Sequence, residues 1–443
     1  MTNKTGKNTF YGWLMLPLLC LVYSIPIGFA LYGPPIINKF MEDSLQMQRW
    51  EVNIGYSIIG IMLGLGALFI PWLMNRFGPK TTLAIGAILT AISSILMALL
   101  GSIMTDFSGQ SLPFVYWLIC VFVGLGISFG SVVPVQALVL LWFNVHRALA
   151  MGLVLGGGAI GGFIYPQIIS YTITAFNNDW RAGWYVIAAA CFIGAAVALA
   201  AVRNRPEDLG QHPDGISPER PGEHVKHPTH RLIRTYRSPI NWSVSAAFRT
   251  HAIWQIMVAT AVIFFLWQLL VSQTPAHLKD RGFLDTDPLL FMQPAFIYGL
   301  IMAFSIVGRL SVSFLGERIE SRYIMSGAAL LIVLGGAFFW LSAKDTLWAV
   351  YLFALLTGVG FGAVYVSIPL ITGNYFGGGS FPQLSRVMNP VNSIFQFSAP
   401  AVAGLVYDAN HSYGPVILIA CLSGLFGAFL ILFCKPPQPD QDK

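Results

Sequence analysis

Charged residues are scarce in this chain of 443 residues. Asp, Glu, Lys and Arg together make up 10% of it, whereas hydrophobic residues make up 56%. Soluble domains carry about 25% charged residues, and the mean hydropathy of this chain is +0.67. The composition therefore excludes an ordinary soluble protein and predicts an all-α membrane protein that crosses the bilayer several times.

The chain also lacks the patterns of metal, disulfide and catalytic sites. Its five cysteines are scattered through apolar runs, without Cys-x-x-Cys or Cys/His spacing. His224, His227 and His230 lie in a polar stretch, which we interpret as a solvated linker and not as a metal site. No Ser-His-Asp or Cys-His arrangement is apparent. We therefore expect no metal, no cofactor and no enzymatic activity.

Apolar runs of roughly 20 residues, the length that crosses a hydrocarbon core, are frequent. Placing both termini in the cytoplasm assigns 18 of the 25 Lys and Arg residues to inside segments and six to outside segments, as the positive-inside rule requires. The net charge of +6 then reflects membrane orientation and does not indicate nucleic acid binding. The twelve predicted spans are 11–32, 51–72, 80–101, 113–141, 149–176, 182–202, 250–273, 289–313, 323–343, 347–371, 384–406 and 413–434.

The two halves of the chain repeat each other. Asn75-Arg76 matches Glu317-Arg318 at an offset of 242, and Gly124-Leu125-Gly126 matches Gly358-Val359-Gly360 at an offset of 234. Between the halves lies the only long polar stretch. We therefore predict an N-terminal six-helix half (1–202), a cytoplasmic linker (203–249) and a C-terminal six-helix half (250–443), the plan of a transporter whose substrate is held between its halves.

One cation, Arg309, lies deep within an apolar run. It precedes Glu317 by eight residues, which places it ~12 Å into the helix. A charge at such depth costs at least ~2.5 kcal/mol and normally faces a cavity or a partner. Its planar guanidinium fits a carboxylate. The alternative is a structural role, in which Arg309 pairs with Glu317 or with helix-end carbonyls.

Polar side chains near Arg309 extend this candidate site. Tyr298 and Ser305 share its helical stripe, and a second polar stripe runs along the span 384–406. Such stripes also form interhelical hydrogen bonds, so for the amides a packing role stays open. The substrate-binding candidates are Arg309, Tyr365, Ser305, Tyr298, Asn389, Asn392 and Gln396, with Tyr32, Tyr56, Gln136, Tyr165 and Gln268 as weaker ones.

The repeated segment resembles the short motif of the major facilitator superfamily, Gly-x-Leu-x-Asp-Arg-x-Gly-Arg-Lys/Arg. Asn75 and Glu317 stand where the motif has Asp, and Pro71 and Ser313 stand where it has the leading Gly. The resemblance implies loops that lock one state of the transporter. The residues that would do so are Arg76, Gly78 and Lys80 in the first copy, and Glu317, Arg318 and Arg322 in the second.

Within the superfamily the chain is similar to the monocarboxylate-transporter and oxalate/formate-exchanger branch. The similarity is carried by Tyr11-Gly12-Trp13, by Trp142-Phe143 with Arg147, by the Arg205–Gly210 segment, by His277-Leu278 with Asp280-Arg281-Gly282, and by Gly308-Arg309. It implies that Arg309 binds the substrate carboxylate and that Tyr365 lies in the site.

Two departures from that branch narrow the expected substrate. Ser305 stands where animal monocarboxylate transporters have a proton-coupling Asp, and the region of Asn389 and Asn392 has no counterpart of the exchanger's second cation, a Lys. One cation suits one carboxylate.

We therefore expect a secondary transporter of a small organic anion with one carboxylate, working by alternating access as a proton symporter or an anion exchanger. We expect it to act as a monomer in the cytoplasmic (inner) membrane. Its expected partners are the lipid bilayer, the organic anion, and a proton or a counter-anion. An exporter of drugs or metabolites with Arg309 structural is the alternative, and a transporter-like receptor is a third hypothesis.

Overall fold

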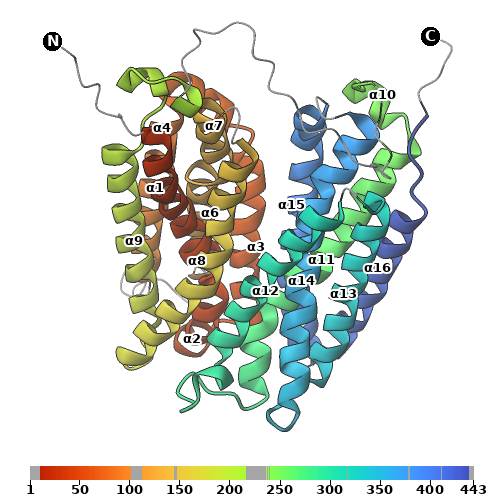
Figure 1. Ribbon diagram of the computed structural model, residues 1–443. Coiled ribbons are helices and arrows are strands. Elements are labelled where there is room, and N and C mark those ends of the chain that lie inside the picture. Colours follow the sequence, from red (N-terminus) through yellow and green to blue (C-terminus); the bar gives the residue numbers. More distant parts are fainter. Residues whose placement is uncertain are drawn as a thin grey trace, which may run out of the picture.

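The structure is a computed structural model that describes residues 10–100, 112–143, 147–215, 236, 238, 240–316, 318–377, 380–410 and 412–438. All regular secondary structure in these ranges is helical. Figure 1 shows the long helices in two bundles, one formed by the red-to-yellow part of the chain and one by the green-to-blue part. Glu317, the three linker histidines and residues 216–235, 237 and 239 of the predicted linker lie outside the described residues.

The first bundle contains eight described helices and one π-helical turn. The π-helix, η1, covers Pro26–Leu31 and follows α1 directly. The α-helices are α1 (Tyr11–Ile25), α2 (Pro34–Leu45), α3 (Arg49–Gly66), α4 (Ile70–Ala98), α6 (Leu112–Phe129), α7 (Val132–Trp142), α8 (Arg147–Ala175) and α9 (Trp180–Ala201).

The second bundle is entered through the short helix α10 (Val244–Phe248). Its long helices are α11 (His251–Asp280), α12 (Pro294–Leu315), α13 (Ser321–Leu341), α14 (Leu347–Phe376), α15 (Phe381–Asn410) and α16 (Gly414–Leu432). Short 3₁₀ turns lie at Pro206–Leu209, Pro213–Gly215, Leu290–Met292 and Lys344–Thr346.

Ten helical segments of the described chain are long and apolar enough to cross a membrane. The helices α3 and α15 complete the twelve predicted spans. They are less apolar because they carry Arg49, Glu51 and Asn53, and Asn389, Asn392 and Gln396, respectively. These two helices pack against each other across the two bundles, so their polar residues have a protein partner instead of lipid.

Two local predictions were wrong. The segment Pro71–Lys80, expected as a loop, is helical within α4 and is interrupted only by Gly78, whose φ of +79° suits glycine. The first span, expected to end at residue 32, passes through η1 and continues after Gly33 as α2. Pro34 and Pro35 begin α2, where their missing N–H groups cost no helical hydrogen bond.

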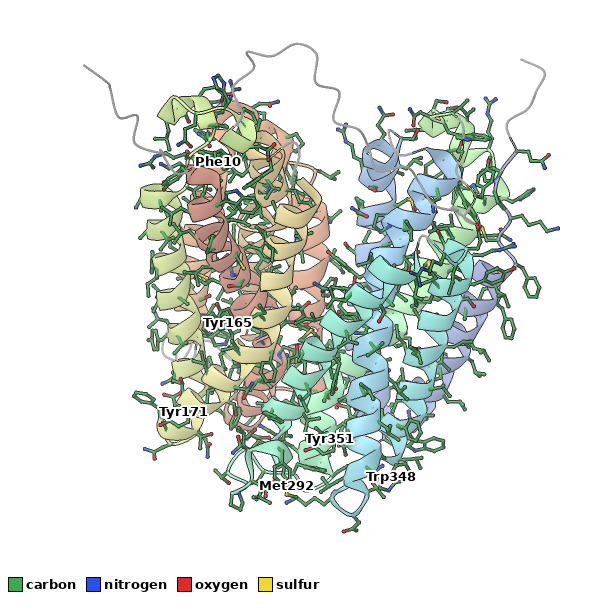
Figure 2. All side chains as sticks on the ribbon, in the orientation of Figure 1. Phe10, Tyr165, Tyr171, Met292, Trp348 and Tyr351 are labelled. Carbon is green, nitrogen blue, oxygen red and sulfur yellow. The ribbon has the colours of Figure 1, made fainter. Side chains whose placement is uncertain are left out.

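The described chain ends lie on one side of the molecule, which we call the inner side. Tyr11 at the start of α1 donates its hydroxyl to the Ala201 carbonyl at 2.7 Å, and Tyr236 donates to the Pro437 carbonyl at 3.3 Å. Figure 2 shows Phe10 on this side, and Tyr171, Trp348 and Tyr351 on the opposite, outer side. Tyr171 is 77% exposed and Trp348 58% exposed, as expected for aromatic residues at a membrane–water interface.

The two bundles meet along two helix pairs, α3 with α15 and α8 with α12. Figure 1 shows the bundles converging toward the outer side and diverging toward the inner side. Close approach at these pairs depends on small residues: a Cβ on Gly60 would meet the Phe397 ring, and one on Gly299 would meet the Phe163 carbonyl.

Glycines also bring α12 and α14 together, which fixes Arg309 relative to Tyr365. A Cβ on Gly362 would overlap the backbone of Ser305, and a Cβ on Gly308 would overlap the Val359 carbonyl. We expect Gly362→Ala to cost about 1–3 kcal/mol, because backbone atoms must move to accept the methyl group. The melting temperature of the purified protein in detergent measures this loss.

Gly327→Ala on α13 is the matched control, since nothing lies within 4 Å of a Cβ at Gly327. It should leave the melting temperature unchanged or raise it, because alanine favours a helix by up to about 1 kcal/mol over glycine. Equal melting temperatures for the two variants would contradict this account of the α12–α14 contact.

Candidate functional site

A cavity of about 160 Å³ lies between the two bundles. The first bundle contributes residues from α1, η1, α3, α7 and α8, and the second from α11, α12, α14 and α15. Arg309 is the only charged group among the eighteen described residues that line it: Tyr23, Ile27, Leu31, Tyr32, Tyr56, Leu63, Val132, Leu155, Gly158, Phe264, Trp267, Gln268, Arg309, Phe361, Tyr365, Ser393, Gln396 and Phe397.

Arg309 reaches from α12 of the second bundle toward α8 of the first. Its Nη1 donates to the Leu155 carbonyl at 3.4 Å, and its guanidinium carbon lies 5.2 Å from the centre of the Tyr365 ring. The first contact is long for a hydrogen bond to a charged donor. The second has the distance of a cation–π contact. The cation therefore faces the cavity from a fixed position between the halves.

Aromatic rings form much of the cavity wall. Phe361, one helical turn before Tyr365 on α14, stacks on Trp267 of α11 with ring centroids 3.7 Å apart and an interplanar angle of 12°. Phe361 also lies 5.8 Å from the Tyr365 ring and 6.2 Å from the Phe264 ring. The rings thus run continuously from the guanidinium of Arg309 into the second bundle.

The remaining polar groups of the wall form a cluster of their own. Gln268 on α11 donates from Nε2 to the Tyr56 hydroxyl at 3.2 Å and accepts at Oε1 from Gln396 Nε2 at 3.1 Å. This cluster joins α3 of the first bundle to α11 and α15 of the second. Both polar ends of Gln268 are therefore used inside the protein.

Half of the twelve predicted substrate-binding residues line the cavity. They are Arg309, Tyr365 and Gln396 among the main candidates, and Tyr32, Tyr56 and Gln268 among the weaker ones. The position of these six in the wall is a fact of the structure, whereas their contact with a substrate stays a prediction.

The other six lie outside the cavity wall, and these placements correct the helical-stripe argument. The Ser305 hydroxyl donates to the Met302 carbonyl at 2.6 Å and its backbone packs against α14. Tyr165 stacks on Phe29 and pairs with Ser24. Tyr298 is fully buried, Asn392 nearly so, Asn389 is exposed and Gln136 is half-buried.

Sequence reasoning missed most of the ring wall. Tyr23, Phe264, Trp267, Phe361 and Phe397 line the cavity, but aromatic residues in apolar spans more often pack against other helices. Tyr23, Ile27 and Leu31 are spaced by four residues and share a helical face, which was the one available signal. The stacking partners come from separate helices, and no local spacing predicts them.

A second group of polar residues joins the two bundles at the outer side. We call Glu42, Arg49, Asp280, Tyr407 and Tyr413 the outer network. Arg49 is 7% exposed; its Nε donates to Glu42 at 2.8 Å and its Nη1 to Asp280 at 2.9 Å. Its guanidinium carbon also lies 3.8 Å from the centre of the Tyr407 ring. Arg49 and Glu42 belong to the first bundle, and the other three residues to the second.

Tyr413, which precedes α16 at the outer side, connects the outer network to a polar pair below it. It accepts from Arg49 Nη1 at 2.9 Å and donates to Gln273 at 2.9 Å. Burial is the largest effect on the pKa of Tyr413 and raises it, so the phenol stays protonated and keeps this donor. Gln273 in turn donates to Asn53 at 3.4 Å.

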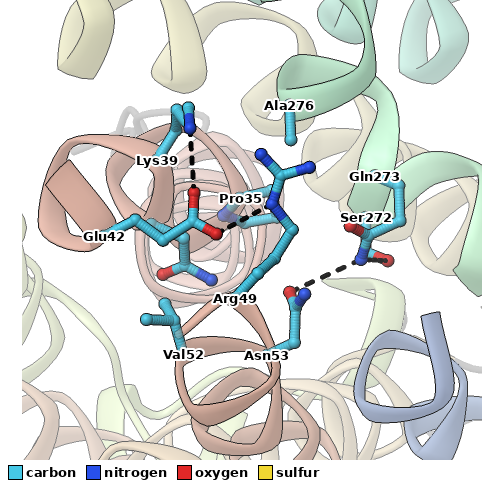
Figure 3. A pocket seen from close by; sticks show the side chains of 10 residues that line it. Pro35, Lys39, Glu42, Arg49, Val52, Asn53, Ser272, Gln273 and Ala276 are labelled. Carbon is cyan, nitrogen blue, oxygen red and sulfur yellow. Dashed lines mark hydrogen bonds and ion pairs between the residues drawn. The ribbon is translucent and has the colours of Figure 1, made fainter. Parts of the chain in front are cut away.

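Figure 3 shows the small cavity beside Arg49, with Lys39 and Glu42 on one side and Asn53 and Gln273 on the other. Its volume is about 20 Å³, room for a single water molecule. Arg49 precedes Tyr56 by seven residues on α3, so the outer network lies ~10 Å along the helix from the central cavity. At this size it is a closed seam and not a second substrate site.

The residues expected to lock the inner side make their described contacts within one bundle. The Arg76 guanidinium lies near the rings of Trp72 and Phe77. Lys80, two residues after Gly78, donates its backbone N–H to the Asn204 side chain. Arg322 donates to the Cys434 carbonyl and the Tyr323 hydroxyl, and Arg318 is exposed. Glu317 lies outside the described residues. Their locking role stays a prediction.

The described residues contain no group of three His, Cys, Asp or Glu side chains that could hold a metal ion. The chemistry that this arrangement offers is thus recognition of an anion by one cation in an aromatic pocket between two bundles. No described group of the cavity wall is a carboxylate.

The family model of the Major Facilitator Superfamily matches residues 18–400. Across the chain, the probable sulfoacetate transporter SauU of Cupriavidus necator is 23% identical over 96% of this chain and 94% of its own length. Monocarboxylate transporter 12 of Rattus norvegicus is 22% identical over 86% of this chain and 76% of its own.

Another relative matches a shorter stretch. The agnestins efflux protein AgnL12 of Paecilomyces divaricatus is 28% identical over 44% of this chain, and the match spans less than half of its own length, also 44%. Among solved structures, a mutant of the nucleoside transporter NupG has a TM-score of 0.69 at 12% identity and covers 94% of this chain and 99% of its own. This likeness, with the family match, confirms the expected fold.

Proposed function

Because this chain belongs to the Major Facilitator Superfamily of membrane transporters, which are not enzymes, we propose that it carries a small organic anion with one carboxylate through the central cavity. The observation that carries the proposal is Arg309, the only charge among the described residues of the cavity wall. A guanidinium stays protonated at any physiological pH and binds a carboxylate through two parallel hydrogen bonds.

The energetic cost of holding a cation in this wall favours the same conclusion. A guanidinium between two bundles in a low-dielectric wall is costly to desolvate, and an anion bound to it offsets that cost. Substrate binding therefore allows the bundles to move while the charge is balanced. Relatives named as a probable sulfoacetate transporter and a monocarboxylate transporter, matched over most of their length, support an organic anion as substrate.

In this proposal the structure represents the state that is closed toward the outside. The outer network closes the seam between α3 and α11, and the bundles diverge on the inner side (Figure 1). The transporter acts as a monomer in the cytoplasmic membrane with its inner side facing the cytoplasm, and Arg309 exchanges its bound carboxylate with either side as the bundles rock.

Purified protein in proteoliposomes tests this function. We expect a labelled monocarboxylate (lactate, acetate or benzoate) to enter, driven either by an imposed pH gradient or by preloaded unlabelled carboxylate. The pH gradient measures proton symport and the preloaded anion measures exchange. Absence of carboxylate uptake under both conditions, with sealed vesicles and folded protein, would rule the proposal out.

Export of an organic metabolite is the second candidate, and the aromatic cavity wall and the match to the efflux protein AgnL12 favour it. The two candidates differ in what stabilises the purified protein. Short carboxylates raise the melting temperature of a carboxylate transporter. Lipophilic cations raising it instead would favour the exporter, in which Arg309 has a structural role.

A further inference from the structure

Most residues of the cavity wall are apolar or aromatic. Beyond the Arg309 guanidinium the wall continues with the rings of Tyr365, Phe361 and Trp267, each in contact with the next. Phe361 is 4% exposed and Trp267 2% exposed, so both rings are held firmly by neighbouring helices. A bound acid of two or three carbons would place its carboxylate at the cation and leave the small accessible part of these rings uncovered.

The size of the cavity limits what could cover that surface. Its volume of about 160 Å³ is close to that of an engineered protein cavity, of about 150 Å³, that binds benzene. One six-membered ring therefore fits this space.

The polar groups of the wall narrow the ligand further. Gln268 uses its amide oxygen and its amide nitrogen within the protein, so its hydrogen bonds are satisfied without a ligand. A dicarboxylate would need a second cation, and among the described residues of the wall Arg309 is the only one. The ligand body next to the rings is therefore uncharged, and the rings themselves favour an apolar one.

We propose that the site is selective for a monocarboxylate carrying a single aromatic ring, with the carboxylate at Arg309 and the ring against Phe361, Trp267 and Phe264. Aromatic rings pair in offset-stacked or edge-to-face arrangements and gain from them beyond the area that they bury. This inference rests on the proposed function, because it uses the same carboxylate contact and adds the identity of the rest of the molecule.

Binding of three acids to the purified full-length protein, measured by calorimetry, tests the proposal. The probes are benzoate, cyclohexanecarboxylate and acetate, which share one carboxylate and differ in ring and size. We expect benzoate to bind about tenfold or more tighter than acetate because of the buried ring area, and a few-fold tighter than cyclohexanecarboxylate because of ring–ring contacts.

Phe361→Leu removes the central ring and keeps an apolar side chain. We expect it to reduce the preference for benzoate over acetate to a few-fold or less, with the larger loss of affinity for benzoate. Phe353→Leu is the matched control: it changes the same residue type on the same helix α14, at a fully buried position that does not line the cavity. It should preserve the preference.

The affinities of the wild-type protein for the three acids test the proposed aromatic selectivity even if a variant does not fold. Equal affinities for benzoate and acetate, or a preference for cyclohexanecarboxylate, would overturn the aromatic selectivity and leave the carboxylate transporter standing. No binding of any of the three acids would overturn both.

Discussion

Arg309→Gln is expected to abolish carboxylate binding while leaving the protein folded. Removing one partner of a desolvated charge pair costs about 2–5 kcal/mol of binding free energy, which weakens binding more than about 30-fold. Arg309→Lys keeps a charge but loses the planar fork, so it should restore only a part of the affinity. Calorimetric titration with the carboxylate that binds the wild type best measures both variants.

The melting temperature without ligand separates a binding role from a structural one. A cation in a low-dielectric wall is costly to desolvate, so Arg309→Gln should leave the melting temperature unchanged or raise it. Arg249→Gln, at an exposed cation between α10 and α11, is the control and should change neither quantity. A large drop in melting temperature together with wild-type affinity would show that Arg309 supports the structure instead of the substrate.

The fold could be predicted from the sequence because each membrane span is recognised from the composition of a short local segment. Twelve apolar runs, the distribution of cations and two repeated segments predicted the architecture without any long-range information. The exceptions have local causes as well. Gly33 with Pro34 and Pro35 allowed the chain to turn and continue as α2. The segment before Gly78 is helical although its polar residues, Asn75 and Arg76, had suggested a loop.

The sequence predicted the position of the cavity only through one residue whose burial in a membrane costs free energy. Arg309 could be found because a cation in an apolar run needs an explanation. Helical spacing then failed for Ser305, because a hydroxyl can be satisfied by a carbonyl of its own helix, here that of Met302. The stacked pair Trp267 and Phe361 is 94 residues apart, and only the packing of helices brings such rings together.

The outer network was missed for the same reason. Arg49 is one of the six cations assigned to outside segments and Asp280 belongs to a motif, but 231 residues separate them. Their contact depends on how the two bundles meet, and that differs between the states of a transporter. A single sequence carries no direct trace of a contact made in one state only.

Breaking this contact should move the protein toward the state that is open to the outside. In Asp280→Asn, Arg49 loses the carboxylate across the seam and keeps Glu42 on its own side. Asp280 is 28% exposed and Arg49 stays paired with Glu42, so losing this charged hydrogen bond costs about 1.5–3 kcal/mol, and only in the closed state. The ratio of outward-closed to outward-open protein should fall about tenfold or more.

Spin labels at the outer ends of the two bundles measure this shift. Phe176→Cys follows α8 and Leu289→Cys precedes α12, and both positions are well exposed, at 64% and 48%. Lys344→Gln is the matched control, because its ion pair with Asp287 at 3.3 Å also lies at the outer side but within the second bundle alone. Asp280→Asn should lengthen the distance between the labels and Lys344→Gln should not. Equal distance distributions in both variants would mean that the outer network is not what holds the seam closed, and that helix packing at α3–α15 and α8–α12 suffices.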